Sequence, residues 1–523
     1  MESYEERPLS IYIHVPFCAR KCAYCDFLSH VPEPDEAAAY FESLLEEIRS
    51  WSELLGKRRI RSIFFGGGTP SFVQGEYIAA CLEEISKRSG RAFTAASGDI
   101  SSTGHDIESV HSIEKSEHDI KSGHSIENSE HDIEGKHEAD LIPEITLEAN
   151  PGTFGEEKLR LWRQAGINRL SIGLQSADDE ELTRLGRIHS WKMFEENYLL
   201  ARSCGFDNIN IDLMSALPGQ TTESWRRTLE KVLALRPEHI SAYSLIIEEG
   251  TPFYELYGDS KTAAGPSAFS GSAVEPSAAA NIAAGSSALS GSAAGSSLSA
   301  NIAAGSSASA GIAVHDDGAS VVSPAPLPSE EDERQMYHFT KMILKQHGYE
   351  RYEISNYSLP GYECRHNIVY WTGGDYLGIG LGASSYIEGR RFRAPENMDE
   401  YRRYAVSEKV LDRCEKQSKN EEMEEFMFLG LRMMEGVSAE DFNRRFSSYE
   451  KDGADQNVKD YQTEPVGGTA PGENVGCDLF SKLYGDVVER YISMGLLQKA
   501  GGRISFTDEG IDVSNRVLAD FML

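Results

Sequence analysis

The sequence predicts an α/β fold in which a parallel sheet is covered by helices, followed by a smaller C-terminal domain. The main observation is an alternation: short apolar or aromatic runs, typical of buried strands, are followed six times by stretches of helical periodicity. The second observation is that such helices supply the crossovers that parallel strands require. The alternation by itself fits a doubly wound open sheet and a partial barrel equally well.

The six predicted strands lie in the first half of the chain. They cover residues 10–15, 62–65, 144–148, 169–174, 208–213 and 239–246. Amphipathic stretches such as 37–52 and 222–235 are predicted helices between them. In folds of this kind the functional side chains gather at the carboxyl ends of the strands. Glu148 ends the third strand, Gln175 follows the fourth and Asp212 lies in the fifth.

Three low-complexity or polar segments interrupt this pattern and are predicted to be insertions. They are a stretch at about 92–140 with a 13-residue repeat from His105, an Ala/Gly/Ser-rich stretch at 258–330, and a polar stretch at about 447–476. The first two lack the large apolar side chains that offset ordering entropy, so we expect them to be disordered. Metal binding by the repeat's histidines is the alternative to simple repeat expansion, which we favour.

The predicted domains follow from these interruptions. Residues 1–250 form the α/β domain, 331–400 form a junction region, and 401–523 form the C-terminal domain. In that last domain a helical pattern precedes a short hairpin and a final helix, which is typical of a winged-helix-like α+β module. We expect this module to act as a lid or a partner surface.

Composition and charge exclude several classes of protein. The 523 residues carry a formal net charge of -32 at pH 7, which argues against a nucleic-acid partner. No apolar run of about 18 residues occurs, so no membrane span is expected. The first residues are acidic and do not resemble a signal peptide, so we expect a cytoplasmic protein. Closely spaced cysteines in that compartment indicate metal or redox chemistry.

Three cysteines in one loop are the strongest functional signal. Cys18, Cys22 and Cys25 form a C-x3-C-x2-C motif directly after the first predicted strand. Three thiolates at this spacing can bind three irons of a [4Fe-4S] cluster and leave the fourth iron without a protein ligand. Structural zinc is the alternative, but it takes four ligands, usually as two separated pairs, and no second pair follows nearby. We therefore predict an iron–sulfur cluster.

This motif resembles that of the radical S-adenosyl-L-methionine (SAM) enzymes. In that superfamily the open iron chelates the amino and carboxylate groups of SAM, and an electron from the reduced cluster cleaves the sulfonium to a 5′-deoxyadenosyl radical. The GGGTP turn at 66–70 adds to the resemblance, because small residues after the second strand let the backbone approach a ligand closely. The resemblance implies a partial (β/α)6 barrel, with a [4Fe-4S] cluster and SAM as cofactors.

Longer segments are similar to the oxygen-independent coproporphyrinogen III oxidase-like family, which includes coproporphyrinogen dehydrogenases and the HemW haem chaperones. They include IYIHVPFCARKCAYCDF, LEANPGT, GINRLSIGLQS and NINIDLMSALPGQ. By this resemblance Cys18, Cys22 and Cys25 are the metal ligands. The positions that match SAM contacts are Tyr12, Tyr24, Gly67, Gly68, Thr69, Glu148, Gln175, Arg187 and Asp212. The alternatives are solvated carboxylates at Glu148 and Asp212 and a surface ion pair at Arg187.

Two departures separate the chain from the dehydrogenases. As the resemblance has it, those enzymes carry a fourth cysteine where this chain has Phe27 and a longer N-terminal extension, whereas only 17 residues precede Cys18 here. Residues 366–371 instead read HNIVYW, a pattern that the resemblance links to haem binding in the chaperones. An exposed His366 suits an axial haem ligand, and a buried, hydrogen-bonded histidine is the alternative. His14 is expected to order the cysteine loop.

The sequence therefore predicts a haem chaperone of the HemW type. Such a protein binds haem and transfers it to haem-dependent respiratory proteins, using the cluster, SAM and an electron donor for the cluster. The main alternative is a coproporphyrinogen III dehydrogenase that makes protoporphyrinogen IX in porphyrin biosynthesis, which the two departures disfavour. A sensor of iron or redox state is a third possibility. Catalytic residues, cleavage of SAM and a homodimer are left open by the sequence.

Overall fold

The computed structural model describes residues 7–93, 142–262, 324–409, 411–446 and 478–523. The His105 repeat and most of the three predicted insertions lie outside these residues. The middle insertion is shorter than the predicted 258–330, because helix α9 (Pro252–Thr262) continues into it and its last part is held by the barrel. There the Gly219 amide donates to the carbonyl of Pro326 over 2.7 Å, and the Tyr257 hydroxyl donates to Ala325 over 3.0 Å.

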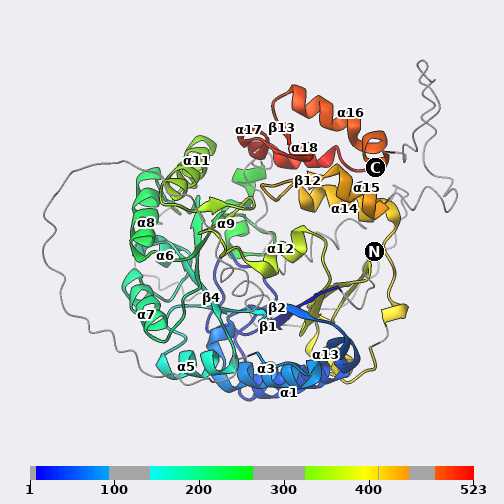
Figure 1. The fold of residues 1–523 in the computed structure, drawn as a ribbon. Coiled ribbons are helices and arrows are strands. Elements are labelled where there is room, and N and C mark those ends of the chain that lie inside the picture. The colour runs from blue at the N-terminus through cyan, green and yellow to red at the C-terminus, as the bar shows by residue number, and fades with distance from the viewer. Residues whose placement is uncertain (1–6, 94–141, 263–323, 410, 447–477) are drawn as a thin grey trace, which may run out of the picture.

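Six parallel strands form the centre of the fold, and Figure 1 shows them curving into a partial barrel with helices outside. Their bounds are β1 (Leu9–Val15), β2 (Ile60–Gly67), β3 (Glu144–Ala149), β4 (Arg169–Gln175), β5 (Ile209–Ser215) and β6 (His239–Ser244). Neighbours in the chain are neighbours in the sheet and run parallel throughout. The predicted partial (β/α)6 barrel is confirmed, and each strand ends within two residues of its predicted end.

Short strands from residues 350–393 extend the sheet at both edges, giving eleven strands in the order β11-β10-β9-β1-β2-β3-β4-β5-β6-β8-β7. β9 (Tyr376–Ile379) pairs with β1, followed by β10 (Ser384–Ile387) and β11 (Arg390–Arg393). At the other edge, β8 (Asn356–Ser358) pairs with β6, and β7 (Glu350–Arg351) pairs with β8. The stretch expected to be a junction therefore belongs to the barrel sheet.

Helices pack on the outer face because each presents an apolar stripe to the sheet. In α8 (Thr222–Leu235), Trp225, Leu229 and Val232 are fully buried at the spacing of one helical face. The other outer helices are α1 (Glu36–Ser50), α2 (Ser52–Lys57), α3 (Gly75–Ser89), α5 (Glu156–Ala165), α6 (Asp179–Arg184), α7 (Trp191–Ser203), α11 (Glu330–Gln346) and α13 (Met398–Ala405). β1 is buried along its whole length, as expected of a parallel strand covered on both faces.

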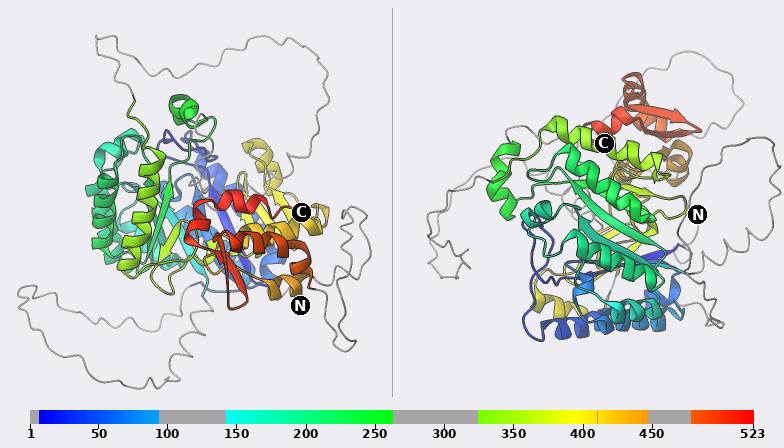
Figure 2. Two further views of the ribbon diagram at one scale, coloured as in Figure 1. Left: turned by 90° about the horizontal axis from the view of Figure 1, so that it is seen from above. Right: turned by 90° about the vertical axis from the view of Figure 1, so that its left-hand side faces the viewer.

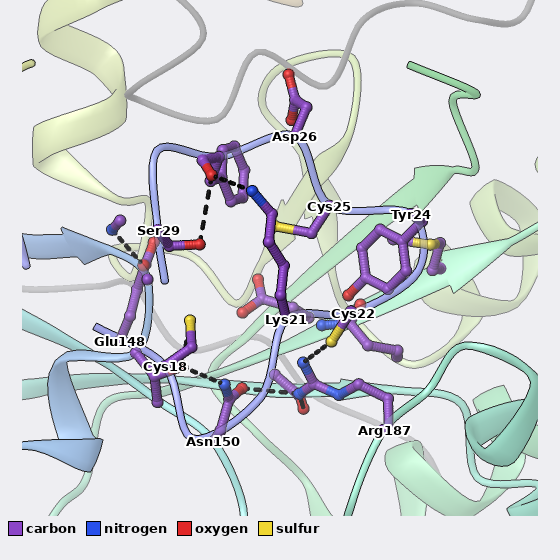
Figure 3. A pocket seen from close by; sticks show the side chains of 18 of the residues that line it. Cys18, Lys21, Cys22, Tyr24, Cys25, Asp26, Ser29, Glu148, Asn150 and Arg187 are labelled. Atoms are coloured by element: carbon purple, nitrogen blue, oxygen red, sulfur yellow. Dashed lines mark hydrogen bonds between the residues drawn. The ribbon is translucent and has the colours of Figure 1, made fainter. Parts of the chain in front are cut away.

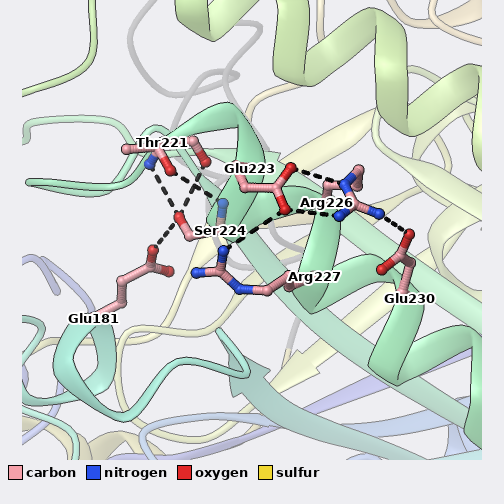
Figure 4. A network of polar contacts seen from close by, with 7 residues as sticks. All are labelled: Glu181, Thr221, Glu223, Ser224, Arg226, Arg227 and Glu230. Atoms are coloured by element: carbon pink, nitrogen blue, oxygen red, sulfur yellow. Dashed lines mark hydrogen bonds and ion pairs between the residues drawn. The ribbon is translucent and has the colours of Figure 1, made fainter.

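A polar network fixes the start of α8 to α6, as Figure 4 shows. Thr221 and Ser224 form a reciprocal capping box, and the Ser224 hydroxyl donates to the Glu181 carboxylate over 2.6 Å. The other Glu181 oxygen accepts from Ser176 and from Gln220. These bonds tie the loops that follow β4 and β5 to each other, at the end of the barrel where functional residues were predicted.

The C-terminal domain has its own core and a three-stranded antiparallel sheet in the order β12-β14-β13. Its elements are α14 (Lys419–Gly430), β12 (Val437–Ser438), α15 (Ala439–Phe446), α16 (Leu479–Ser493), β13 (Leu497–Ala500), β14 (Arg503–Phe506), α17 (Asp508–Asp512) and α18 (Ser514–Ala519). This arrangement confirms the expected smaller α+β domain. Figure 2 shows it packed on one side of the barrel, where His338 of α11 contacts Asp512 at 3.3 Å.

Helix α12 (Arg365–Trp371) carries the HNIVYW pattern and lies between the two domains. It contacts β2 inside the barrel and α14 of the C-terminal domain, as can be followed in Figure 1. Among the described helices, none combines the length and the apolar character that crossing a membrane requires.

Candidate functional site

A cavity of about 190 Å³ opens at the carboxyl ends of the barrel strands, and Figure 3 shows its walls. The first five strands, or the segments that follow them, contribute predicted cluster and SAM residues to it, as is typical of parallel barrels. The predicted residues that line it are Cys18, Cys22, Tyr24, Cys25, Gly67, Gly68, Thr69, Glu148, Gln175, Arg187 and Asp212. The structure thus brings together residues that are spread over nearly 200 positions of the sequence.

The cysteine loop is fixed to the end of β1 and to the glycine turn. The Cys18 amide donates to the carbonyl of His30 over 2.9 Å, which closes the loop on itself. His14 is buried in β1 and its Nε2 is hydrogen-bonded to the carbonyl of Leu28 at 2.9 Å, so it orders the loop as expected. The hydroxyl of Thr69 donates to Cys18 Sγ over 3.4 Å.

The three thiols are arranged around one space (Figure 3). Burial raises the pKa of Cys25 to about 12, so this thiol stays protonated at neutral pH until a metal ion binds it. In the described part of the chain, no three His, Cys, Asp or Glu side chains converge on a point that one ion would occupy. A [4Fe-4S] cluster needs no such point, because each thiolate binds a different iron. The donor set therefore fits a cluster with one open iron.

Arg187 is one of the cationic side chains that line the cavity, together with Arg20 and Lys21. Its Nη2 donates to Asn150 Oδ1 over 2.7 Å and to the carbonyl of Gly173 over 2.5 Å, while its Nη1 lies 3.8 Å from Cys22 Sγ. Although burial disfavours the charged form, Tyr24 and Cys22 raise the pKa of Arg187, so it remains a cation. Its Nε is buried and has no hydrogen-bond partner among the described residues. The guanidinium is therefore held in place by the cavity wall, with its Nε unpaired among the described residues, which differs from a surface ion pair.

Two carboxylates lie at the ends of the third and fifth strands. Glu148 accepts a hydrogen bond from the Gly67 amide over 3.2 Å. Asp212 accepts from Ser171 over 3.0 Å and from Asn210 over 2.7 Å. Burial raises the pKa of Asp212, and these hydrogen bonds oppose the shift. Asp212 is thus a half-buried acceptor that its neighbours orient, and not a solvated carboxylate.

Glycines allow the backbone to approach closely at two points of the cavity. A Cβ atom on Gly68 would lie 2.7 Å from the carbonyl oxygen of Phe17, in the cysteine loop. A Cβ atom on Gly173 would lie 2.8 Å from Asn150 Oδ1 and 3.1 Å from Arg187 Nη2. Both glycines therefore keep space for neighbours that position the cysteines and the arginine.

Two predicted site residues lie outside this cavity. Tyr12 is buried beside Phe64 and its hydroxyl is hydrogen-bonded to His14, so it contacts the cavity only through its neighbours. Of the two alternatives for His366, the structure shows the buried, hydrogen-bonded histidine. Its ring is fully buried, with Nδ1 hydrogen-bonded to Ser62 at 2.9 Å and Nε2 to Tyr370 at 2.9 Å. Burial lowers the pKa of His366 to about 3. Haem ligation would require one ring nitrogen to give up its hydrogen bond and become accessible.

Polar side chains connect the cavity to the start of α12 through the barrel interior. Asp212 accepts from Asn210, whose Oδ1 is hydrogen-bonded to His239 Nδ1 at 2.6 Å. His239 Nε2 is hydrogen-bonded to the Tyr352 hydroxyl at 2.8 Å, and that hydroxyl accepts from the Cys364 amide. Cys364 precedes α12 as its N-cap residue, so the strand that carries Asp212 is linked to this helix.

Sequence reasoning missed two residues that shape the cavity. Asn150 joins its two halves, because its Nδ2 donates to Thr69 and its Oδ1 accepts from Arg187. Ser171 orients Asp212 from the neighbouring strand. Asn150 stands two positions after Glu148, at the end of a predicted strand, and that position was the available signal. Ser171 lies within β4, and the sequence around it does not distinguish it from any other buried residue of a strand.

The site and the fold define a class of protein. Residues 12–232 match the model of the radical SAM superfamily, and residues 417–465 match that of the HemN C-terminal domain. Over nearly its whole length, the chain is also similar to proteins described as the haem chaperone HemW. It is 28% identical to that of Lactococcus lactis over 99% of this chain and 98% of the relative.

Further comparisons agree with this placement. The HemW haem chaperone of Bacillus subtilis is 28% identical over 91% of this chain and 100% of the relative. Among solved structures, the coproporphyrinogen III oxidase HemN of Escherichia coli has a TM-score of 0.61 and 18% identity, covering 99% of this chain and 91% of that chain. At that identity the match establishes a shared fold.

Proposed function

We propose that this protein is a haem chaperone of the HemW type, which binds haem and passes it to haem-dependent respiratory proteins. The observation that carries the proposal is the cysteine loop: it supplies three thiols to the cavity and has Phe27, also in the cavity wall, where the dehydrogenases continue with a cysteine. The similarity to HemW relatives over nearly their whole length supports the same choice.

In this proposal each part of the cavity has a role. Cys18, Cys22 and Cys25 hold a [4Fe-4S] cluster, which supplies one electron at a time when reduced by an external donor. The free Nε of Arg187 and the oriented oxygens of Asp212 bind the polar groups of SAM. SAM is then placed against the open iron by groups that are already held in position, so little ordering is needed on binding.

Reconstitution tests the metal site. The protein is reconstituted with iron and sulfide under anaerobic conditions and its iron, sulfide and SAM binding are measured. The expected result is about four irons and four sulfides per chain, as one cubane cluster holds. Cys22→Ser loses the cluster, whereas Cys414→Ser retains it, because Cys414 is a free cysteine outside the cavity. One zinc per chain, or a cluster that survives Cys22→Ser, contradicts the proposal.

Haem transfer tests the chaperone function. Tagged protein loaded with haem is mixed with a haem-free b-type cytochrome, the two are separated, and the Soret absorbance of each is measured with and without SAM and reductant. The proposal expects one haem per chain and faster transfer than from the protein with Cys22→Ser. Failure of the unaltered protein to bind haem in this stoichiometry overturns it.

A further inference from the structure

A second and larger cavity, of about 490 Å³, lies between the barrel and the C-terminal domain. The barrel contributes the end of α12 and the turn after it, together with β10. The C-terminal domain contributes α14, α15 and the segment between them. Its volume falls in the range of small-molecule sites, and such sites are common at domain interfaces. None of the residues expected to bind the cluster or SAM lines it.

The lining of this interdomain cavity combines apolar and aromatic side chains with both arginines and carboxylates. The carboxylates are Glu422, Glu425, Glu435 and Asp441, of which Glu425, Glu435 and Asp441 are paired with arginines. The apolar part consists of Trp371, Tyr386, Phe426, Leu429, Met433 and Val437. The arginines are Arg7, Arg444, Arg445 and Arg503. A ligand that matches both is broad and apolar, with carboxylates at its edge, because aromatic side chains pack on rings and guanidinium groups pair with carboxylates.

Arg445 is the arginine available to such a carboxylate. Arg444 and Arg503 both face Asp441, and Arg503 also donates to the carbonyl of Gly436. The guanidinium of Arg445 lies over the Phe446 ring, and its charge opposes the rise in the pKa of Tyr386 that burial causes. Among the described residues, no carboxylate forms an ion pair with Arg445. A Cβ atom on Gly373 would lie 3.4 Å from Arg445 Nη1, so its guanidinium reaches across from α15 to the barrel wall.

Trp371 forms an aromatic part of the cavity wall. Only 4% of this side chain is exposed, and its Nε1 is buried without a hydrogen-bond partner in the described structure, as are those of Trp51 and Trp162 in the barrel. The contribution of Trp371 to the cavity is therefore its ring surface. The guanidinium of Arg432 covers the Trp371 ring at 4.8 Å and fixes its position.

We propose that the interdomain cavity binds haem, with its ring against Trp371 and a propionate at Arg445. This inference rests on the proposed function, because it gives the haem of the chaperone a place. Haem is a broad apolar ring with two carboxylates on one edge, which is the combination that the lining selects. The wall also contains Met433, whose thioether is a ligand type that haem iron accepts. In this assignment His366 keeps its hydrogen bonds inside the barrel, and Trp371, the last residue of the same helix, faces the haem.

Helix α12 links the cluster and SAM cavity to the proposed haem cavity. The carboxylate of Glu144 accepts from the amides of Arg365 and His366 at the start of α12, where a negative charge is favourable. The network from Asp212 reaches the same end through Tyr352. Trp371 is the last residue of α12, so a shift of this helix driven at the SAM cavity moves a wall of the haem cavity.

Haem titration of four variants tests the assignment. Arg445→Glu removes the cation, and Leu429→Trp fills the cavity; each is expected to raise the dissociation constant for haem by at least about tenfold. Arg516→Glu makes the same charge change at an exposed position of the same domain, and Leu429→Met conserves volume. Both controls are expected to bind haem within about twofold of the unaltered protein. Retained cluster content shows that each variant folds.

The outcomes separate this inference from the proposed function. If the unaltered protein binds no haem, the chaperone proposal itself fails. If it binds one haem and both Arg445→Glu and Leu429→Trp bind it equally well, haem lies elsewhere and only the cavity assignment is overturned. Metal-free protoporphyrin IX gives a further check, because recognition of ring and propionates predicts the same loss in both variants without iron.

Discussion

Arg187 shows how one side chain connects the two halves of the cluster and SAM cavity. It donates to Asn150 and Gly173 and touches Cys22, yet it sits in a loop after α6, far from each of them in sequence. A guanidinium has enough donors to make these bonds and still bind a ligand, whereas an ammonium group has three donors on one atom.

We therefore expect Arg187→Lys to weaken SAM binding and spare the cluster. The dissociation constant for SAM, measured by calorimetry on reconstituted protein, should rise at least about tenfold, while iron content is unchanged. Arg184→Lys is the matched control, because Arg184 lies one turn earlier and pairs with the exposed Glu180. Equal SAM affinity in both variants would show that Arg187 has only a structural role.

A buried acid on α1 gives the molecule a predicted pH dependence. Glu47 is fully buried and accepts from the Tyr401 hydroxyl and the Gly380 amide. Burial raises its pKa from 4.5 to about 7. The folded state therefore binds this proton more tightly than the unfolded state, and the contribution to stability is lost as pH rises from 4.5 through 7.

Glu47→Gln should remove this dependence. As the pH rises from 4.5 to 8, the free energy of unfolding of the unaltered protein should fall by about 3 kcal/mol relative to that of the variant. This figure follows from the shift in the pKa of Glu47, because each pKa unit corresponds to about 1.4 kcal/mol. Denaturant unfolding across this pH range measures the difference. Glu46→Gln, at an exposed neighbouring position, should follow the unaltered protein. Parallel pH profiles for Glu47→Gln and the unaltered protein would contradict the shifted pKa.

Residue types and spacing revealed the cavity better than they revealed burial. The C-x3-C-x2-C motif and the strand ends placed most site residues correctly, because parallel strands bring their carboxyl ends to one place. The exposure of His366 could not be inferred from its motif, because burial depends on Ser62 and Phe64, about 300 positions away. The interdomain cavity was missed for the same reason.

Among the structural elements, the cysteine loop and the glycine turn depend on each other. The Gly68 amide donates to Val15, and the Thr69 amide donates to Phe17, so the turn holds the loop from behind. The six long strands were predictable because each has six or more residues with a clear pattern. β7 to β11 have two to four residues each, too few for a period of two to be seen.

Gly68→Ala is expected to damage cluster binding. Its Cβ atom would lie within 3.0 Å of the Phe17 backbone, so the loop carrying Cys18 must move. Iron content after reconstitution should fall by more than about half, because the cluster needs all three thiols in place. Gly155→Ala is the control, since a Cβ atom there meets nothing within 4 Å. Full iron content in Gly68→Ala would mean that the loop adapts freely.

For the whole molecule, the structure combines a partial (β/α)6 barrel and a C-terminal domain, with a cavity in the barrel and another between the domains. The repeat at 105–137 lies outside the described residues. We expect deletion of 105–137 to leave the iron content after reconstitution unchanged, since the predicted cluster ligands lie in one loop at 18–25. Loss of iron in that deletion would assign the repeat a metal-binding role.

Turnover of coproporphyrinogen III distinguishes a coproporphyrinogen dehydrogenase from a haem chaperone. It is measured by anaerobic incubation of the reconstituted protein with SAM, dithionite and coproporphyrinogen III, with the products identified by mass spectrometry. A haem chaperone is expected to give no decarboxylated porphyrinogen, although the same preparation binds one haem per chain. Protoporphyrinogen IX formed over many turnovers would contradict this expectation and identify the protein as an enzyme of porphyrin synthesis.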